Sequence, residues 1–180
     1  ELLEAFYKML RAIEVKREKT KYHSPRMVAF VEMFGMLFGL DNNEMNILKT
    51  TAKLHDIGYV GAAGISSLAS IGSELAHPIA GATMISNLPI HKDVIEGIKT
   101  HHEWVNGKGT PNELKGEDIP WTGKIIAVYE YVVDFFESNP NIDPSKEDEM
   151  LEKLKSNLIE RADIQFDMVL IPTVIQQLTM

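Results

Sequence analysis

The 180-residue sequence contains no cysteine. This absence excludes thiolate catalysis, cysteine-ligated zinc and iron–sulfur clusters, so any bound metal must be held by nitrogen and oxygen ligands. It also agrees with a reducing compartment, and we expect a cytoplasmic protein. The sequence has no uncharged apolar run of about 18 residues, the length that a membrane-spanning helix requires, so we expect no membrane partner.

Basic side chains are also scarce. Lys and Arg number 18 against 26 Asp and Glu, which gives a formal net charge of −8. Sequence-independent binding to a nucleic acid polymer needs clustered positive charge, so this function is excluded, while a local basic pocket is compatible with the composition. The length and the 44% hydrophobic content fit one globular domain. Because the sequence starts at Glu1 and shows no signal peptide, we interpret residues 1–180 as a single domain excised from a longer chain with an N-terminal regulatory part.

Hydrophobic periodicity predicts helices throughout the chain. Apolar residues recur every three or four positions over residues 2–13, and a longer apolar run covers residues 24–40. Asp41, Asn42 and Asn43 supply the predicted N-cap of the helix that ends near Leu54, and Pro78 is predicted to lie in the first turn of its helix. No segment shows the clean alternation of a strand, so the fold is predicted to be all-α. The remaining predicted segments are helices over 42–54, 93–102, 119–136, 145–160 and 167–178, a Gly/Ala/Ser-rich connection over 58–72 and a Gly/Pro-rich loop over 104–120.

Most of the six histidines fall at or beside predicted helix ends. A lone histidine is usually structural, but two of these positions carry adjacent carboxylates, in His55-Asp56 and in His102-Glu103. Neutral imidazole and carboxylate oxygen together form ligand sets suited to Fe, Mn, Ni or Zn. Spacing alone does not show that these side chains meet. For the sixth histidine, His91, we expect a surface role or a supporting role behind a ligand, and no direct metal binding. The five histidines at helix ends are His23, His55, His77, His101 and His102.

Five short motifs follow one another in a defined order. In that order they resemble the HD-GYP subfamily of HD-domain metal-dependent phosphohydrolases. The resemblance implies an all-α HD-domain helical bundle with extra C-terminal helices, and a bacterial signalling enzyme that hydrolyses cyclic di-GMP. The motifs are His23-Ser24-Pro25-Arg26-Met27-Val28, Leu54-His55-Asp56-Ile57-Gly58, His77-Pro78-Ile79-Ala80-Gly81, His101-His102-Glu103 and Gly107-Lys108-Gly109-Thr110-Pro111.

The resemblance also implies two divalent metal ions, with iron or manganese expected. Two adjacent metals polarise a phosphodiester and activate water for in-line attack, with no protein nucleophile. Our candidate catalytic residues are His55, Asp56 and Tyr59. The implied ligands of the first metal are His23, His55, Asp56 and Glu130, and those of the second are His77, His101, His102 and a bridging Asp56.

Several positions depart from the family pattern. Glu130 stands where the family has aspartate, and Tyr59 where it has a lysine near the substrate phosphate. Thr110 replaces the tyrosine of Gly-Tyr-Pro, and Asn139 stands in the segment where the family has a phosphate-pairing arginine. Lys19 occupies the position of a glutamate associated with a third metal, so two metals are expected. The changes preserve the metal ligands and erode the substrate-recognition set.

The candidate substrate-binding residues are Arg26, Tyr59, Lys108 and Thr110. Cyclic dinucleotide hydrolysis is the favoured function. Two alternatives stay open: a catalytically weak binding or signalling module, and a phosphohydrolase that acts on another phosphoester. The expected partner is a cyclic dinucleotide substrate, and a homodimer or signalling-domain partners are compatible with the sequence. We expect Glu103 to orient a histidine rather than to bind metal.

Overall fold

The computed structural model describes residues 1–16, 22–62, 73–141 and 143–180. Regular structure in these ranges is helical, with two isolated β-bridges and no strand, so the all-α prediction is confirmed. None of the helices described combines the length and apolarity needed to cross a membrane. The helices are α1 (Leu2–Lys16), α2 (His23–Phe38), α3 (Asn42–Leu54), α4 (Gly58–Ala62), α5 (Ser73–Ile85), α6 (Lys92–Thr100), α7 (Trp121–Glu137), α8 (Glu147–Glu160) and α9 (Ile171–Leu178), with 3-10 turns at Gly116–Asp118 and Pro144–Lys146.

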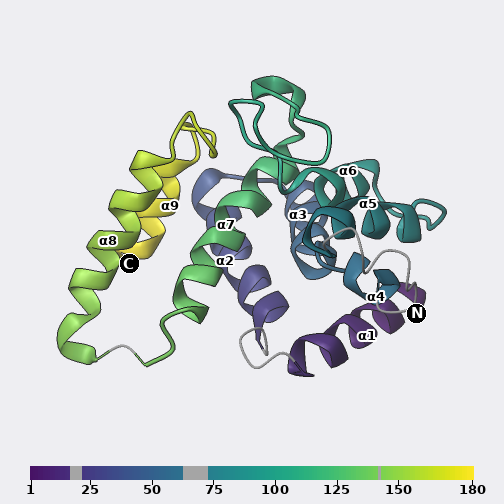
Figure 1. Ribbon diagram of the computed structural model, residues 1–180, viewed down its shortest axis with the longest axis horizontal. Coiled ribbons are helices and arrows are strands. Elements are labelled where there is room, and N and C mark those ends of the chain that lie inside the picture. Colours follow the sequence, from purple (N-terminus) through teal and green to yellow (C-terminus); the bar gives the residue numbers. More distant parts are fainter. Residues whose placement is uncertain (17–21, 63–72, 142) are drawn as a thin grey trace.

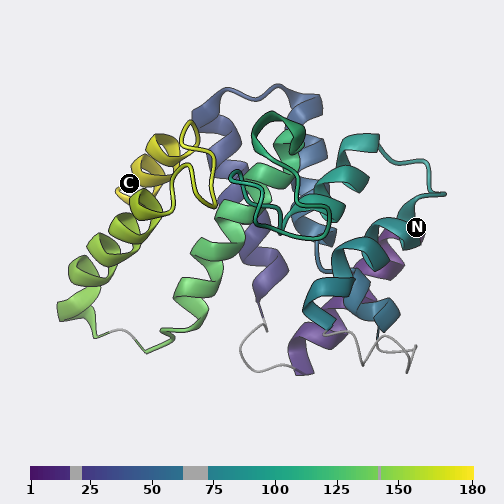
Figure 2. The same ribbon diagram turned by 45° about the horizontal axis from the view of Figure 1, so that its top comes forward.

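Helix α7 runs through the middle of the molecule (Figure 1). It is apolar on most sides because α2, α6 and the C-terminal helices cover it, and Tyr129 and Val132 on it are buried. The antiparallel pair α8 and α9 packs on the α2 and α7 side, while α1, α4 and α5 lie at the opposite end, as Figures 1 and 2 both show. The extra C-terminal helices therefore complete the main core instead of extending into solvent.

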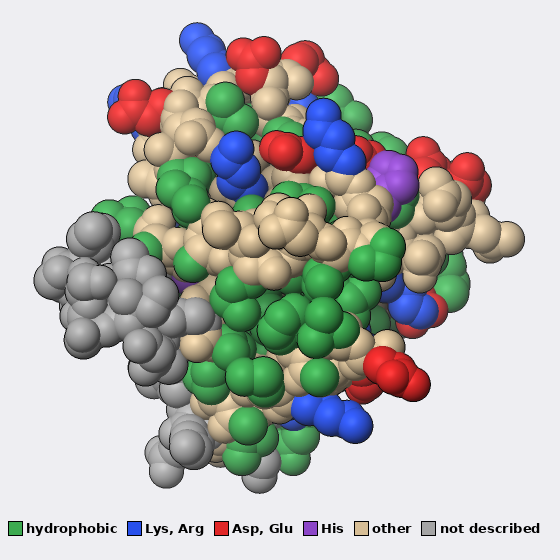
Figure 3. All heavy atoms as spheres, turned by 90° about the vertical axis from the view of Figure 1, so that its right-hand side faces the viewer, with side chains coloured by type: hydrophobic (Ala, Val, Ile, Leu, Met, Phe, Trp, Pro, Cys, Tyr) green, Lys and Arg blue, Asp and Glu red, His purple; other side chains and the backbone are tan. Residues whose placement is uncertain are grey.

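A second, smaller core lies beneath α1, α3, α5 and α6. Its buried members include Leu10 and Ile98, and partly buried residues such as Leu88 pack around them. Hydrophobic side chains gather on the surface of the face that carries the N-terminal end of α1 and the turn after α5 (Figure 3). The metal-ligand candidates lie on helices that contribute to both cores, so the two cores together fix their positions.

Two reciprocal glycine–threonine contacts bring α6 and α7 close together. A Cβ atom on Gly97 would lie 2.5 Å from Oγ1 of Thr122, and a Cβ atom on Gly123 would lie 2.3 Å from Oγ1 of Thr100. Real Cβ atoms do not approach so closely, so larger residues at either glycine would push the helices apart. This close packing places the C-terminal end of α6, and the double histidine that follows it, beside α7.

Two carboxylates fix the N-termini of the helices that carry the first histidines. Of the three N-cap candidates, Asp41 caps α3, where it forms a capping box with Glu44. At α2, the buried carboxylate of Glu14 on α1 accepts hydrogen bonds from the backbone N–H and hydroxyl of Ser24. This carboxylate gives the backbone N–H of Ser24 a partner at the start of α2. Its negative charge also interacts favourably with the positive end of the helix dipole, next to His23.

The prediction for Pro78 was wrong. Helix α5 begins at Ser73, so Pro78 lies inside the helix, where its missing N–H removes one intrahelical hydrogen bond. Proline is common in the first turn of a helix, but the turn that precedes it here belongs to the same helix. The predicted connection over 58–72 contains the short helix α4, and its residues 63–72 lie outside the described part of the chain, as does Lys19.

Candidate metal centre

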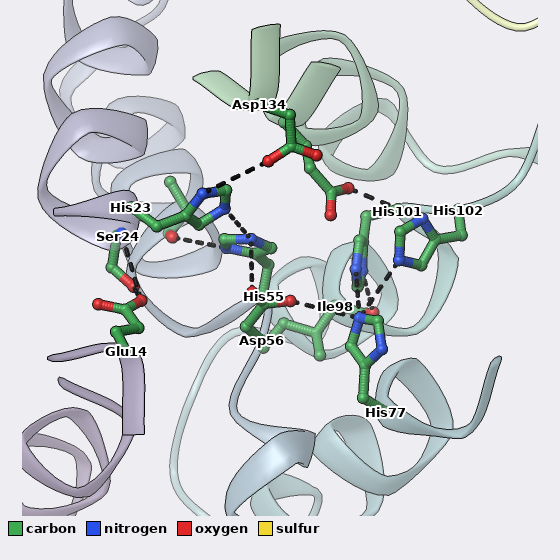
Figure 4. A network of polar contacts seen from close by, with 12 residues as sticks. Glu14, His23, Ser24, His55, Asp56, His77, Ile98, His101, His102 and Asp134 are labelled. Carbon is green, nitrogen blue, oxygen red and sulfur yellow. Dashed lines mark hydrogen bonds and ion pairs between the residues drawn. The ribbon is translucent and has the colours of Figure 1, made fainter. Parts of the chain in front are cut away.

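Five histidines and one aspartate from four helices converge on a single site. His23 begins α2, and His55 and His101 are the C-cap residues of α3 and α6. His77 projects from α5, and His102 and Asp56 each follow a C-cap residue. Figure 4 shows the six side chains pointing toward one another. The structure therefore brings together residues that span 80 positions of the sequence.

Backbone carbonyl groups fix the orientation of two imidazoles. Nδ1 of His55 lies 2.9 Å from the carbonyl oxygen of Ala52, and Nδ1 of His101 lies 2.6 Å from that of Ile98. A carbonyl oxygen can only accept, so Nδ1 carries the proton in both rings and Nε2 presents a lone pair. The acceptors are carbonyl groups of the last helical turn, which lack intrahelical partners. The helix ends thus prepare both histidines as ligands.

The Nε2 atoms form two groups. In one group, Nε2 of His23 lies 3.2 Å from Nε2 of His55. In the other, Nε2 of His77 lies 3.0 Å from that of His101 and 3.3 Å from that of His102. Ligand atoms of His77, His101 and His102 all lie within 4.8 Å of one another, and so do those of His23, His55 and Asp56. Each group is compact enough to surround one cation.

Asp56 lies between the two groups. One carboxylate oxygen is 3.6 Å from Nε2 of His55, and the other is 3.3 Å from Nε2 of His77. The second oxygen, Oδ1, is buried and makes no hydrogen bond of acceptable geometry to the described residues. A buried carboxylate oxygen without a hydrogen bond is costly unless a cation binds it. Together with the converging lone pairs, this oxygen shows that the residues present fit two metal ions with Asp56 shared between them.

Close packing of α4 against α5 sets the distance between Asp56 and His77. A Cβ atom on Gly58 would lie 2.0 Å from the carbonyl oxygen of His77 and 2.7 Å from the backbone nitrogen of Gly81. Only glycine allows this approach. The glycine of the His-Asp-Ile-Gly motif therefore permits the contact that joins the two histidine groups.

Helix α7 presents three carboxylates along one side of the site. Oε2 of Glu130 lies 3.7 Å from Nδ1 of His102, and its carboxylate also approaches ligand atoms of Asp56 and His101. The resemblance assigns Glu130 to the first metal, whereas the structure places it beside the second group. Asp134, one turn later on the helix, is the carboxylate near the first group, with Oδ1 3.7 Å from Nδ1 of His23.

The third carboxylate, Glu137, is buried and contacts two cationic groups. Its Oε2 lies 3.2 Å from Nδ1 of His23, and its Oε1 accepts a hydrogen bond of 3.2 Å from Nη1 of Arg26. A carboxylate accepts, so Nδ1 of His23 donates and its Nε2 is directed toward His55. Such an outer carboxylate orients a metal-binding histidine and increases its basicity. Nothing in the sequence patterns pointed to Glu137.

Burial and charge set the protonation of the histidines in opposite directions. Burial lowers the pKa values of His55 and His101, and burial with the neighbouring His77 lowers the pKa of His102 to about 4. Burial also acts to lower the pKa of His23, but the hydrogen bond to Glu137 and the charge of Asp56 outweigh it and raise this pKa to about 9. The nearby histidines hold the pKa of Asp56 well below its usual range despite burial. His55, His101 and His102 are therefore neutral beside an ionised Asp56, as metal binding needs, whereas His23 would have to lose a proton when it binds a metal.

A cavity of about 310 Å³ opens above these side chains. Its lining combines metal-ligand candidates with residues that the sequence did not indicate, notably Tyr131 and Gln165. The lining residues are His23, Asp56, Tyr59, His101, His102, Ala127, Glu130, Tyr131, Asp134 and Gln165. The cavity therefore gives a bound molecule direct access to both histidine groups.

The four candidate substrate-binding residues occupy different places. Tyr59 lines the cavity and stacks on His77, with ring centroids 4.3 Å apart and an interplanar angle of 17°. Lys108 and Thr110 lie next to it, in a shallower pocket that shares His102. Arg26 is bonded to Glu137 and does not line the cavity. Three of the four residues therefore lie around the site, whereas Arg26 contacts Glu137 instead.

Two predicted accessory roles can be compared with the structure. His91 is half exposed and caps α6 by accepting a hydrogen bond from the backbone N–H of Asp93, in agreement with a surface role. Glu103 is buried, but it accepts hydrogen bonds from the backbone N–H groups of Asn112 and Leu114. Among its contacts found in the described residues none is to a histidine, so the expectation that Glu103 orients one was wrong. Glu103 instead ties the loop beside the site to the end of α6 through these two hydrogen bonds.

Residues 8–166 match the HD domain family. The chain belongs to this family. Its relatives and structural neighbours are HD-GYP proteins, which confirms the interpretation drawn from the order of the motifs. The structural neighbours are also HD-domain helical folds, so the predicted all-α HD-domain bundle is confirmed.

Three proteins illustrate the similarity of this HD domain to others. A 3′3′-cGAMP-specific phosphodiesterase 2 of Vibrio cholerae is 30% identical over 69% of the chain, which covers 26% of that protein. The cyclic di-GMP phosphodiesterase response regulator RpfG of Xanthomonas campestris is 30% identical over 80% of the chain, which covers 39% of it. A crystal structure of a V. cholerae cyclic GMP-AMP-specific phosphodiesterase, V-cGAP3, superposes with a TM-score of 0.74 and 19% identity, over 99% of this chain and 49% of that one. The chain thus spans half or less of the length of each.

Proposed function

We propose that this HD domain is a metal-dependent phosphodiesterase that hydrolyses a cyclic dinucleotide, with cyclic di-GMP as the first candidate. The observation that carries the proposal is the position of Asp56 between two histidine groups, with one buried oxygen that lacks a hydrogen bond. Such an arrangement suits two cations that share a carboxylate. The relatives named for cyclic di-GMP and 3′3′-cGAMP support the substrate class.

The ligand assignment follows the two groups. His23, His55 and Asp56 would hold the first metal, and Asp56 would also contribute to the second. Two divalent ions, iron or manganese, match ligands of neutral imidazole and carboxylate. When bound, such ions polarise a phosphodiester and make water nucleophilic at neutral pH. The second metal would be held by His77, His101 and His102, with Glu130 as a further carboxylate.

The remaining side chains bind and orient the substrate. Tyr59 offers a phenol hydroxyl at the cavity, and its stacking on His77 limits its movement. Lys108 and Thr110 extend the site toward the loop after α6. Arg26 is held by Glu137, so we assign it to supporting His23 and not to the phosphate. His55, Asp56 and Tyr59 remain our proposed catalytic residues.

Turnover of cyclic di-GMP by protein reconstituted with Fe²⁺ or Mn²⁺ tests this proposal. We expect hydrolysis by the wild type and its loss in His55→Ala and Asp56→Ala. His91→Asn is the matched control, because His91 lies outside the site and asparagine retains the N-cap acceptor. Equal rates in all variants would refute the proposal. Tight binding without turnover would favour a binding or signalling module. Turnover of a different phosphoester in a substrate panel would favour a phosphohydrolase with another substrate.

Three further predictions rest on the sequence alone. They are a cytoplasmic location, a bacterial signalling role, and a homodimer or signalling-domain partner.

A further inference from the structure

We propose that Gln165 determines base specificity, by donating a hydrogen bond from its amide nitrogen to a carbonyl oxygen of a substrate nucleobase. The inference rests on the proposed function, because it assigns a nucleobase contact within the same cavity. Gln165 lies in the turn between α8 and α9, far from the family motifs in sequence. Yet it lines the cavity together with Tyr131 and Glu130.

Arg161 fixes which end of the Gln165 amide faces the cavity. Nη1 of Arg161 donates a hydrogen bond of 3.1 Å to Oε1 of Gln165. A guanidinium group has only donors, so the atom facing it must be the amide oxygen. The amide nitrogen is thereby directed away from Arg161, and no hydrogen bond from it to another described residue is found. Gln165 presents a neutral donor to whatever the cavity holds.

Aromatic contacts hold Arg161 and the turn in place. The guanidinium carbon of Arg161 lies 4.9 Å from the centre of the Tyr131 ring, a cation–π contact. Buried Phe166 packs its ring against the same tyrosine, with centroids 5.4 Å apart. Tyr131 therefore anchors both sides of Gln165 from α7.

Backbone hydrogen bonds make the turn rigid. The N–H groups of residues 164–166 all donate to the carbonyl oxygen of Arg161, at 2.9 to 3.2 Å. Val105 and Asn106, in the loop after the double histidine, donate to carbonyl groups of the turn at 3.2 and 3.1 Å. Figure 2 shows the turn beside this loop. A side chain supported in this way is oriented before the substrate binds, as a specificity contact requires.

The residues that line the cavity favour a nucleobase over a phosphate near Gln165. None of the cavity-lining residues, all of which belong to the described ranges, is Lys or Arg, and Glu130 and Asp134 repel anions there. The charge of Arg161 is already shared between Gln165 and Tyr131. A neutral amide beside an aromatic ring is suited to hydrogen bonding and stacking with bases. Guanine presents a carbonyl acceptor where adenine presents an amino donor, so a fixed donor selects guanine.

The variant Gln165→Glu tests this assignment. Glutamate retains the acceptor for Arg161 but replaces the donor with an acceptor of the same size. We expect KM for cyclic di-GMP to rise about tenfold or more, from the lost hydrogen bond and the opposed oxygens. For cyclic di-AMP, KM or the inhibition constant is expected to stay unchanged or fall. Turnover of bis(p-nitrophenyl) phosphate, which has no base, and metal content should both equal those of the wild type.

Gln176→Glu is the matched control, because it adds the same charge at an exposed position of α9. An unchanged KM for cyclic di-GMP in Gln165→Glu would overturn the role of Gln165, and so would an equal increase for both cyclic dinucleotides, which indicates charge alone. Failure of the wild type on every cyclic dinucleotide, with bis(p-nitrophenyl) phosphate still hydrolysed, would instead remove the proposed function together with this contact.

Discussion

Nδ1 of His23 donates a hydrogen bond of 3.2 Å to the buried carboxylate of Glu137, a residue 114 positions away in the sequence. The other oxygen of this carboxylate accepts from Arg26. The contact joins the start of α2 to the end of α7 and points Nε2 of His23 at the first metal group. The first histidine of the HD domain is thus oriented by a residue outside the motifs.

Glu137→Gln is expected to weaken the first metal site. The glutamine keeps the size of the side chain but removes the negative charge that supports His23, and loss of such a contact lowers metal affinity about 10-fold to 100-fold. Titration of the loaded protein with a competing chelator, followed by metal analysis, measures this change. The exposed Glu160 on α8 gives the control variant Glu160→Gln. Equal retention of metal by all three proteins would show that Glu137 has no such role.

Gly58→Ala is expected to disturb both stability and metal content. The added methyl group would meet the carbonyl oxygen of His77, so α4 and α5 must separate. Overpacking of this kind typically costs about 1–3 kcal/mol in the free energy of unfolding. Urea unfolding gives the stability, and metal analysis gives the occupancy, which should fall because Asp56 and His77 move apart. Wild-type values for both quantities would contradict the close packing described here.

The ion pair between Asp167 and Lys124 predicts a pH-dependent contribution to stability. Burial acts to raise the pKa of Asp167, but the bond of 2.9 Å from Nζ of Lys124 and the backbone N–H of Val169 outweigh it, so this pKa is lowered. A carboxylate whose pKa is lower in the folded state stabilises the fold at pH values above its unfolded pKa of about 3.9. This stabilisation is lost as the pH falls through the folded-state pKa.

We therefore expect Asp167→Asn to unfold about 0.5–1 kcal/mol more easily at pH 7, a range reduced for partial exposure of the pair. The difference from wild type should shrink as the pH falls from 5 toward 3. Urea unfolding across this range measures it. A difference that stays constant with pH would exclude the carboxylate charge as its source.

Removal of metal is expected to lower the thermal stability. A ligand that binds only the folded state, present at about 100 times its Kd, adds roughly 2.7 kcal/mol to the free energy of unfolding. Thermal unfolding with and without Mn²⁺ should show this stabilisation in the wild type and in His91→Asn, and a smaller one in His101→Asn. A metal-induced shift of the same size in His101→Asn would place the bound ion elsewhere.

Much of the fold follows from local patterns in the sequence. The helix over residues 42–54 has its N-cap and capping box encoded within four residues, and the apolar run that becomes α7 is long enough to identify. Pro78 was misplaced because proline chemistry alone does not tell a first turn from a helix interior. Local signals therefore predict the helices, while the start of α5 lies five residues before the position that Pro78 indicated.

The site was predictable only as far as its motifs extend. The histidines and Asp56 were found because the family motifs name them, and the structure brings them together. Glu137 and Gln165 carry no motif, since one acts through a contact with α2 and the other enters from a turn tied to a distant loop. Their roles depend on tertiary contacts, which spacing in the sequence does not encode.

The most direct test of the two-metal account is anomalous diffraction from crystals of Fe- or Mn-loaded protein, collected at the absorption edge of the metal. We expect two peaks on either side of the Asp56 carboxylate, one at His23 and His55 and the other at His77, His101 and His102. A single peak, or peaks remote from Asp56, would contradict the account.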